Sequence, residues 1–432
     1  MDKISILRDK MQSLYFQNDL EAAIHVGDAL LREHFHVDEH MSVSYANDLF
    51  NVAKIYDEAH QFERAVELYG ESARQIIMLQ DDNLAFANRL TAMAIAMSKM
   101  QMKEQAYLIH SQVAGITARV LGADDPLYAD SLVNLAHASE DVGFLEDSLD
   151  FLYESLKIRE RAGLFDPVIE SLMCISYVYE KKDNNEQAIV YAQTAIDLME
   201  DDEQNAALAG ICNYLAGLFE KTDQPLKALT MYDDVLSIVF ENVGNDHSVY
   251  LNVAYKRAGL LKQLGRTVDA LKAYEDVKRV FETHADEHHI FYANCVRNMA
   301  LIYKERGEAK TAIPLMERSI DIRKATADNI TQDIVIVMEL YFKVKDYESA
   351  VKTFMSAVEH YDAESPELTE MLHVFRTGLK MNDPEEMEKL LDTFEALGAL
   401  DRFGQLMDEW AAARADQMGI HFNLGDAKIK PE

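Results

Sequence analysis

The sequence of 432 residues is 49% hydrophobic and 27% charged, which provides enough apolar surface for a folded protein and excludes a mainly disordered chain. Only 17 Gly and 7 Pro are present, and this scarcity argues against a loop-rich or all-β chain and favours an all-helical one. The formal net charge of −33 would repel phosphate, so nucleic acid is not expected as a partner, whereas a basic peptide or protein surface would be attracted.

The N-terminal segment, Met1 to Arg8, has no uninterrupted apolar stretch behind its basic residues and does not predict a secretory signal. No apolar run in the sequence reaches the ~20 residues of a membrane span. Cys174, Cys212 and Cys295 each lie inside an apolar helical pattern, which is typical of buried thiols in a reducing compartment. We therefore expect a cytoplasmic protein without disulfides or membrane insertion.

An internal repeat runs through most of the chain. A small residue, followed four positions later by an aromatic one in segments such as 62–69, 268–274 and 347–354, recurs at intervals of 42, 41, 42, 40, 40, 42, 42 and 38 residues. These anchor positions are Ala23, Ala65, Ala106, Ser148, Ala188, Ala228, Ala270, Ala312 and Ala350. Twelve residues before them stand Met11, Ala53, Ala94, Ala136, Ser176, Ala216, Ala258, Ala300 and Met338.

The two sets of small positions predict that each unit is a pair of antiparallel helices, because small residues are needed where two helices approach closely. Three residues after the second set come mostly large residues, which we expect to fill the gap towards the neighbouring unit. Gly143, Gly265 and Gly307, or polar runs such as Asp183 to Asn185, lie between the two helices and suit the left-handed residue that ends a helix.

Between units, a Gly is followed by an acid or a Ser that could cap the next helix. The residues of this kind in the linkers are Asp124, Asp125, Asp166, Asp246 and Ser248. We interpret the doubled acids at these junctions, such as Asp124 and Asp125, as caps and helix-dipole partners rather than calcium ligands, because they lack the spacing of a calcium loop.

This pattern resembles the tetratricopeptide-repeat family and, with its period of about 42 residues, is most similar to the repeats of kinesin light chain. The segments Leu121 to Pro126 and Asn134 to Ala136 are similar to the linker and the helix entry of that family. The resemblance covers residues 1–360, as about nine repeats. It implies an all-α, right-handed superhelical solenoid of tandem antiparallel helix pairs, whose first helices line a concave face.

After Tyr361 the repeat register fades, although three more helices are expected up to Gln417. A terminal segment must cover the otherwise exposed apolar face of the last repeat. We therefore interpret residues 361–432 as a helical C-terminal cap that continues the solenoid and ends in a loose tail.

Candidate ligand contacts lie at fixed offsets on the first helices. Asn51, Asn134 and Asn298 stand two residues before the second set of small positions, and in the resembled family Asn at such places holds the backbone of a peptide ligand. The candidate peptide-binding residues are Asn47, Asn51, Asn134, Asn213, Tyr255, Asn294, Arg297, Asn298 and Lys304. The alternative interpretation is that the Asn side chains make inter-helix hydrogen bonds or simply face water.

Nothing in the sequence predicts an enzyme, a metal site or a cofactor. The hydrolase, nucleotide-binding, dinucleotide-binding and zinc-protease motifs are all missing. The histidine groups 34, 36 and 40, and 284, 288 and 289, lie at inter-helix junctions without a cysteine, so we do not interpret them as metal ligands.

The leading hypothesis is an adaptor or scaffold that binds a protein or peptide segment in the concave groove of the solenoid. One alternative is a peptide-sensing receptor of the bacterial kind, although the repeats begin almost at Met1 and leave no room here for an N-terminal effector region. Another is a structural subunit of a larger assembly.

Overall fold

The computed structural model describes most of the chain up to residue 358, and every regular element within the described part is an α-helix. The described residues are 3–37, 41–80, 83–199, 206–283, 290–325, 330–358, 369, 371, 374, 389, 392–399, 401, 402, 404 and 405. None of the helices in these ranges is long and apolar enough to cross a membrane. Most of the predicted C-terminal cap, residues 361–432, lies outside the described residues and stays a prediction.

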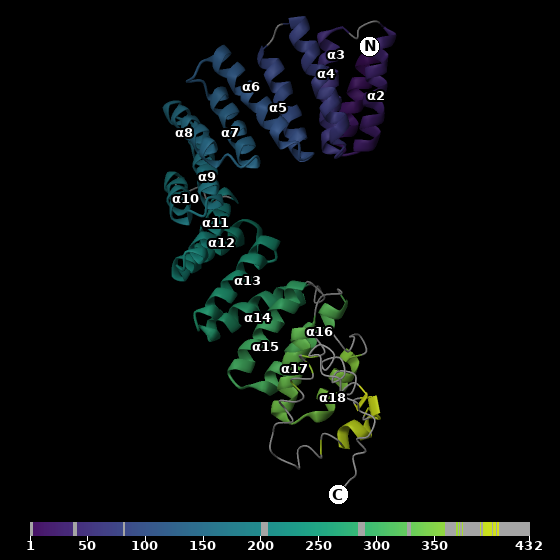
Figure 1. Ribbon diagram of the computed structural model, residues 1–432, viewed down its shortest axis with the longest axis vertical. Coiled ribbons are helices and arrows are strands. Elements are labelled where there is room, and N and C mark those ends of the chain that lie inside the picture. Colours follow the sequence, from purple (N-terminus) through teal and green to yellow (C-terminus); the bar gives the residue numbers. More distant parts are fainter. Residues whose placement is uncertain are drawn as a thin grey trace, which may run out of the picture. The chain divides into compact units, whose positions relative to one another are not determined.

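The chain divides into two compact units, and the first spans Met1–Gln224. Its helices follow one another in chain order (Figure 1). They are α1 (Lys3–Phe16), α2 (Leu20–His36), α3 (Val43–Glu58), α4 (Phe62–Gln80), α5 (Asn83–Lys99), α6 (Lys103–Leu121), α7 (Pro126–Asp141), α8 (Leu145–Arg161), α9 (Phe165–Lys181), α10 (Asn185–Leu198) and α11 (Ala206–Lys221).

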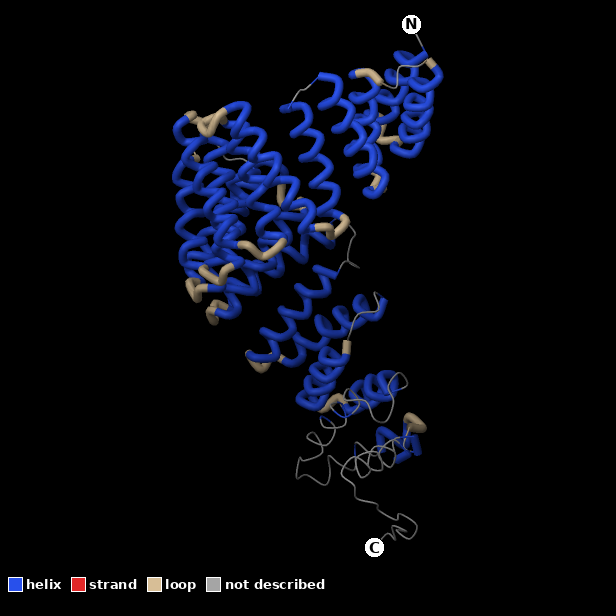
Figure 2. The backbone as a smooth tube through the Cα atoms, turned by 45° about the horizontal axis from the view of Figure 1, so that its top comes forward, coloured by secondary structure: helices blue, strands red, loops and turns tan. Residues whose placement is uncertain are grey.

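The second unit spans Pro225–Glu432. Its helices are α12 (Pro225–Val243), α13 (Ser248–Gln263), α14 (Thr267–Thr283), α15 (Ile290–Glu305), α16 (Ala309–Ala325), α17 (Thr331–Val344) and α18 (Tyr347–Val358). Within each unit every helix packs against the helices before and after it in the sequence. Figure 2 shows the short turns that join them. The predicted all-α stack of helix pairs is confirmed.

The small positions of the repeat are buried in the core. All nine anchors have 0% exposure, and the nine residues that stand twelve positions earlier have at most 1%. Large residues are buried to a similar degree, including Leu30, Leu49, Tyr69, Tyr232 and Tyr274, each at most 2% exposed. The sequence pattern therefore identified the helix-packing seam of every unit correctly.

The turn inside every pair has one geometry. The residue five positions before each anchor has a positive φ, and it is a glycine in only three of the nine units. In each turn the N–H of the following residue donates to the C=O five residues back at 2.8 to 3.0 Å, which is the Schellman closure of a helix end. The left-handed residues are Asn18, His60, Gln101, Gly143, Asp183, Asp223, Gly265, Gly307 and Lys345.

The predicted helix caps between units are only partly correct. The Asp125 side chain accepts from the N–H of Leu127 at 2.8 Å, so that cap is confirmed. The prediction for Asp166 is wrong, because α9 begins one residue earlier and Asp166 lies in its first turn, where its charge still favours the helix dipole. The prediction for Ser248 is also wrong, because His247 caps α13 through its Nδ1 atom at 3.3 Å.

Neighbouring helix pairs are joined by side-chain hydrogen bonds at equivalent positions of the repeat. Three tyrosines lie three residues after the second small position of their own repeat. The hydroxyl of each contacts a side chain that lies five residues after the anchor of the preceding repeat. The pairs are Tyr56 with Asp28 at 3.0 Å, Tyr179 with Tyr153 at 2.8 Å, and Tyr341 with Glu317. These contacts confirm at three junctions that the large residues face the neighbouring unit.

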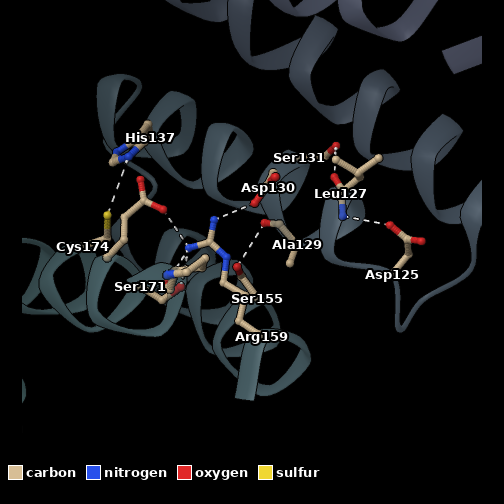
Figure 3. Close-up of polar contacts among 12 residues, drawn as sticks. Asp125, Leu127, Ala129, Asp130, Ser131, His137, Ser155, Arg159, Ser171 and Cys174 are labelled. Carbon is tan, nitrogen blue, oxygen red and sulfur yellow. Dashed lines mark hydrogen bonds and ion pairs between the residues drawn. The ribbon is translucent and has the colours of Figure 1, made fainter. Parts of the chain in front are cut away.

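A second junction position is polar and buried. Arg159, on α8, is 3% exposed and donates to Asp130 of α7 at 2.7 Å and to Ser171 of α9 at 2.9 Å (Figure 3). His34 and Arg323 stand at the same offset, eleven residues after their anchors, and each pairs with a buried aspartate of the next first helix. At Arg159 this position of the second helix therefore joins three successive helices.

Candidate peptide-binding face

Four of the predicted asparagines, Asn47, Asn51, Asn134 and Asn213, lie on first helices of the unit that ends at Gln224. Asn51 of α3 and Asn134 of α7 each stand two residues before a fully buried alanine, and both side chains are partly exposed. Neither amide has a hydrogen-bond partner within the described part of the chain. Their donor and acceptor atoms are therefore available to a ligand.

Asn213 of α11 is held differently. Its Oδ1 atom is buried and accepts no hydrogen bond from the described residues. Gly210 and Gly217 lie one turn before it and one turn after it on the same face, and a Cβ added at either would meet no atom within 4 Å. The backbone of α11 therefore has open space beside it one turn before and one turn after this unsatisfied amide oxygen.

Asn47 serves the packing of the helices. Its Oδ1 accepts from Arg89 Nη2 at 2.7 Å, and Arg89 also donates to Ser72 at 2.8 Å and to the Ala85 carbonyl at 2.9 Å. Arg89 is 6% exposed and comes from α5, whereas Asn47 comes from α3. The inter-helix alternative therefore describes Asn47 in this structure.

Four more candidates form one network in the unit that begins at Pro225. Asn298 Nδ2 donates to the Tyr255 hydroxyl at 3.0 Å and to the Asn294 carbonyl at 3.1 Å. Arg323 donates to the Asn294 side chain, and Arg297 pairs with the buried Asp333 at 2.5 Å. Burial raises the pKa of Tyr255, so its hydroxyl stays protonated and hydrogen-bonding at neutral pH.

Lys304 lies apart from that network. Its Nζ atom pairs with Glu339 of α17 at 2.5 Å, and both side chains are about one-third or more exposed. The structure thus brings Tyr255, Asn294, Arg297 and Asn298 together and leaves Lys304 at a separate inter-helix ion pair.

The offset that selected Asn51, Asn134 and Asn298 also selects Cys174, which sequence reasoning did not include. Cys174 stands two residues before Ser176 on α9, and its Sγ lies 3.8 Å from Nε2 of His137 on α7 (Figure 3). His137 Nδ1 in turn lies 3.3 Å from Glu140. The same offset applied to every repeat, rather than to asparagine alone, would have found this thiol.

No group of three or more His, Cys, Asp or Glu residues within the described ranges could hold a metal ion. His34 is engaged by Asp48 at 2.8 Å, which Arg8 also contacts. His40, His284, His288 and His289 lie outside the described residues. All three cysteines are buried, and none of them forms a disulfide within the described part of the chain.

Comparison with known proteins identifies the repeat. A tetratricopeptide-repeat family model matches residues 250–325, which correspond to α13 to α16. No curated protein sequence matches the chain. The predicted resemblance to tetratricopeptide repeats is thereby confirmed, and such a fold is that of a protein-interaction scaffold.

Several solved structures are similar to the chain at low identity. BtubC (BKLC) from P. vanneervenii is 20% identical, covering 52% of this chain and 92% of that one, with a TM-score of 0.45. The TPR-like kinesin-light-chain repeats from Podosopora anserina are 15% identical, covering 47% and 98%, with a TM-score of 0.41. The quorum sensor NprR from B. thuringiensis in its apo form is 13% identical, covering 82% and 98%, with a TM-score of 0.44.

Proposed function

We propose that the protein is an adaptor that binds a peptide segment of a partner protein along the first helices of residues 1–224. The observation that carries this proposal is that amides on α3, α7 and α11 have no hydrogen-bond partner among the described residues. Asn51 and Asn134 have no hydrogen-bond partner among the described residues, and the buried Oδ1 of Asn213 has none either.

An asparagine amide can accept from a peptide N–H and donate to a peptide C=O at the same time. Such contacts hold a ligand by its main chain and depend little on its side chains. An amide already satisfied inside the protein gains less from a ligand, because it must first give up its partner. For this reason Asn51, Asn134 and Asn213 are the primary contacts in the proposal.

The other candidates take a supporting part. Asn47, Asn294 and Asn298 are engaged in inter-helix hydrogen bonds, and Arg297 and Lys304 are engaged in ion pairs. Tyr255 packs edge-on against Tyr274 and Phe291, with ring centroids 5.8 and 5.9 Å apart. A ligand that reached these residues would meet a surface fixed in advance, which lowers the entropic cost of binding.

The net charge of −33 supports a basic ligand, which would be attracted at long range and bound more weakly as salt is added. We infer a cytoplasmic, non-catalytic role that needs no cofactor and involves neither nucleic acid nor membrane insertion.

The experiment is a selection of peptides from a random displayed library on the purified full-length chain, followed by fluorescence anisotropy with the best peptide. The triple variant Asn51→Ala, Asn134→Ala and Asn213→Ala should raise Kd by at least about tenfold, because each lost hydrogen bond costs about 1 kcal/mol.

A matched control removes three amides from second helices instead. Gln105, Gln112 and Gln187 are exposed on α6 and α10, so their replacement by Ala should leave Kd within about twofold. Equal affinity of the wild type and the asparagine variant for every selected peptide would refute the proposed binding face.

A further inference from the structure

Cys174, His137 and Glu140 form a chain of three polar side chains on two successive first helices. The Cys174 Sγ lies 3.8 Å from His137 Nε2, and the Glu140 carboxylate lies 3.3 Å from His137 Nδ1. A nucleophile beside a base that is itself oriented by a third group is the arrangement that activates a thiol. The proposed peptide-binding function makes no use of this arrangement.

Glu140 sets the orientation of the imidazole. Its side chain is 6% exposed and also accepts from Lys181 Nζ at 2.6 Å. Burial works against ionisation, but the hydrogen bonds from His137 and Lys181 outweigh it and lower the pKa of Glu140. An ionised carboxylate at Nδ1 keeps the proton on that nitrogen and leaves Nε2 free to accept the proton of the thiol.

The same contacts stabilise the imidazolium that forms once Nε2 has taken the proton of the thiol. The contact with Cys174, followed by that with Glu140, raises the pKa of His137 to about 10, although burial acts in the opposite direction. His110, on α6, lies close enough to be affected by the charge of His137; burial, followed by that charge, lowers the pKa of His110 to about 4, so it is neutral at pH 7. Tyr177 also faces Cys174, and burial raises the pKa of its hydroxyl.

His137 and Cys174 lie near the protein surface. The His137 side chain is 54% exposed, and Cys174 is 8% exposed, against 3% for Cys212 and 0% for Cys295. Burial raises the pKa of the Cys295 thiol to about 12. Cys295 is therefore an internal reference for a thiol without this setting.

We propose that Cys174 is a site of thiol modification by low-molecular-weight disulfides, with His137 as its base. The thiol proton passes from Sγ to Nε2 of His137. The thiolate attacks one sulfur of the disulfide, so that a new S–S bond forms to Cys174 and the old S–S bond breaks. The departing thiolate takes the proton from His137, and one free thiol is released for each mixed disulfide formed.

The test treats the full-length protein with oxidised glutathione at pH 7 and measures the mixed disulfide on each cysteine by peptide mass spectrometry. We expect Cys174 to react at least about tenfold faster than Cys212 or Cys295. His137→Asn should lower the rate at Cys174 by at least about tenfold, while leaving the other two unchanged. His25→Asn, at an exposed histidine of α2, is the matched control and should have no effect.

A pH profile of the wild type decides the matter even if His137→Asn disturbs folding. Alkylation of Cys174 by iodoacetamide should persist below pH 7, where the same reaction of free glutathione falls with its thiolate. A Cys174 rate that follows free glutathione, or that equals the rates at Cys212 and Cys295, would overturn the proposal. These readouts involve no peptide ligand, so their failure is distinguishable from failure of the adaptor function.

Discussion

His110 of α6 occupies a position that is aromatic in other second helices. It stands four residues after its anchor, as do Tyr69, Tyr232, Tyr274 and Phe354, and it is 4% exposed. Its Nδ1 atom is buried without a partner among the described residues. Burial, followed by the nearby charge of His137, lowers the pKa of His110 to about 4.

This pKa makes the stability of the fold depend on pH. In the unfolded chain the imidazole is protonated near its usual pKa of 6.5, whereas in the folded protein it stays neutral down to about 4. The contribution of neutral His110 to the free energy of unfolding is therefore complete above pH 6.5 and is lost as the pH falls towards 4. Between pH 7.5 and pH 5 the loss should be about 2 kcal/mol, as measured by urea unfolding.

The variant His110→Phe separates this group from the other titrating residues. It places an aromatic ring where other repeats carry one and removes the buried base, so its loss of stability over the same pH range should be smaller by about 2 kcal/mol. His25→Gln, at an exposed site, should behave as the wild type. Identical pH dependence in His110→Phe and the wild type would show that His110 does not titrate in this way.

At the scale of the helices, the turns inside the pairs are the most regular feature. Nine of them place a left-handed residue five positions before the anchor, but six of these residues are not glycine. A side chain in the left-handed region costs roughly 1 kcal/mol, because its Cβ approaches the following carbonyl. The Schellman hydrogen bonds and the packing of the pair offset that cost in every unit.

Gln101→Gly should therefore raise the free energy of unfolding by about 0.5 to 1 kcal/mol, since glycine adopts the positive φ of this turn without strain. Gln112→Gly, in the middle of α6, is the matched control and should lower it by about 1 kcal/mol. Thermal unfolding of both variants provides the comparison. A destabilised Gln101→Gly would mean that the glutamine side chain stabilises the turn.

The sequence predicted the helix pairs well because small residues at two packing positions leave a periodic mark. It identified three left-handed glycines but not His60 or Gln101. A residue with a side chain adopts this conformation only because the second helix of the pair then packs against the first. The predictions of helix caps at Asp166 and Ser248 were wrong for a similar reason. His247 and Leu164 begin their helices because the chain turns there, and neither residue type predicts a cap strongly.

For the candidate site, the sequence could place a side chain on a helix but could not say whether its amide is already satisfied. The offset that identified Asn51 and Asn134 applies equally to Asn298, yet Asn298 is bonded to Tyr255 of the preceding first helix. Asn47 is engaged by Arg89 from α5. These partners come from other helices, so no pattern within one helix reveals them.

At the scale of the molecule, contacts run between successive helices within each unit. In such stacks, stability is close to a sum of local terms, and a defect loosens its neighbours more than distant repeats. Arg159 allows this to be tested, because its side chain is 4% exposed and joins α7, α8 and α9.

Arg159→Ala should speed amide hydrogen exchange in α7 to α9 by about thirtyfold, which corresponds to a loss of about 2 kcal/mol, and leave α14 to α17 unchanged. Arg161→Ala is the matched control. Its ion pair with Asp124 joins side chains that are 70% and 81% exposed, so exchange should change little anywhere. Uniformly faster exchange in Arg159→Ala would indicate that the chain unfolds as one cooperative body.

The constant sequence separations within each helix pair determine where residues could be inserted or deleted. The second small position, the left-handed turn and the anchor keep separations of seven and five residues in all nine units, although the repeat length varies from 38 to 42. All of the variation therefore falls between an anchor and the next pair. An epitope tag or a few extra residues inserted after Gly122 would preserve the phase of the flanking pairs, whereas a single deletion between a turn and its anchor would rotate the whole second helix out of the core.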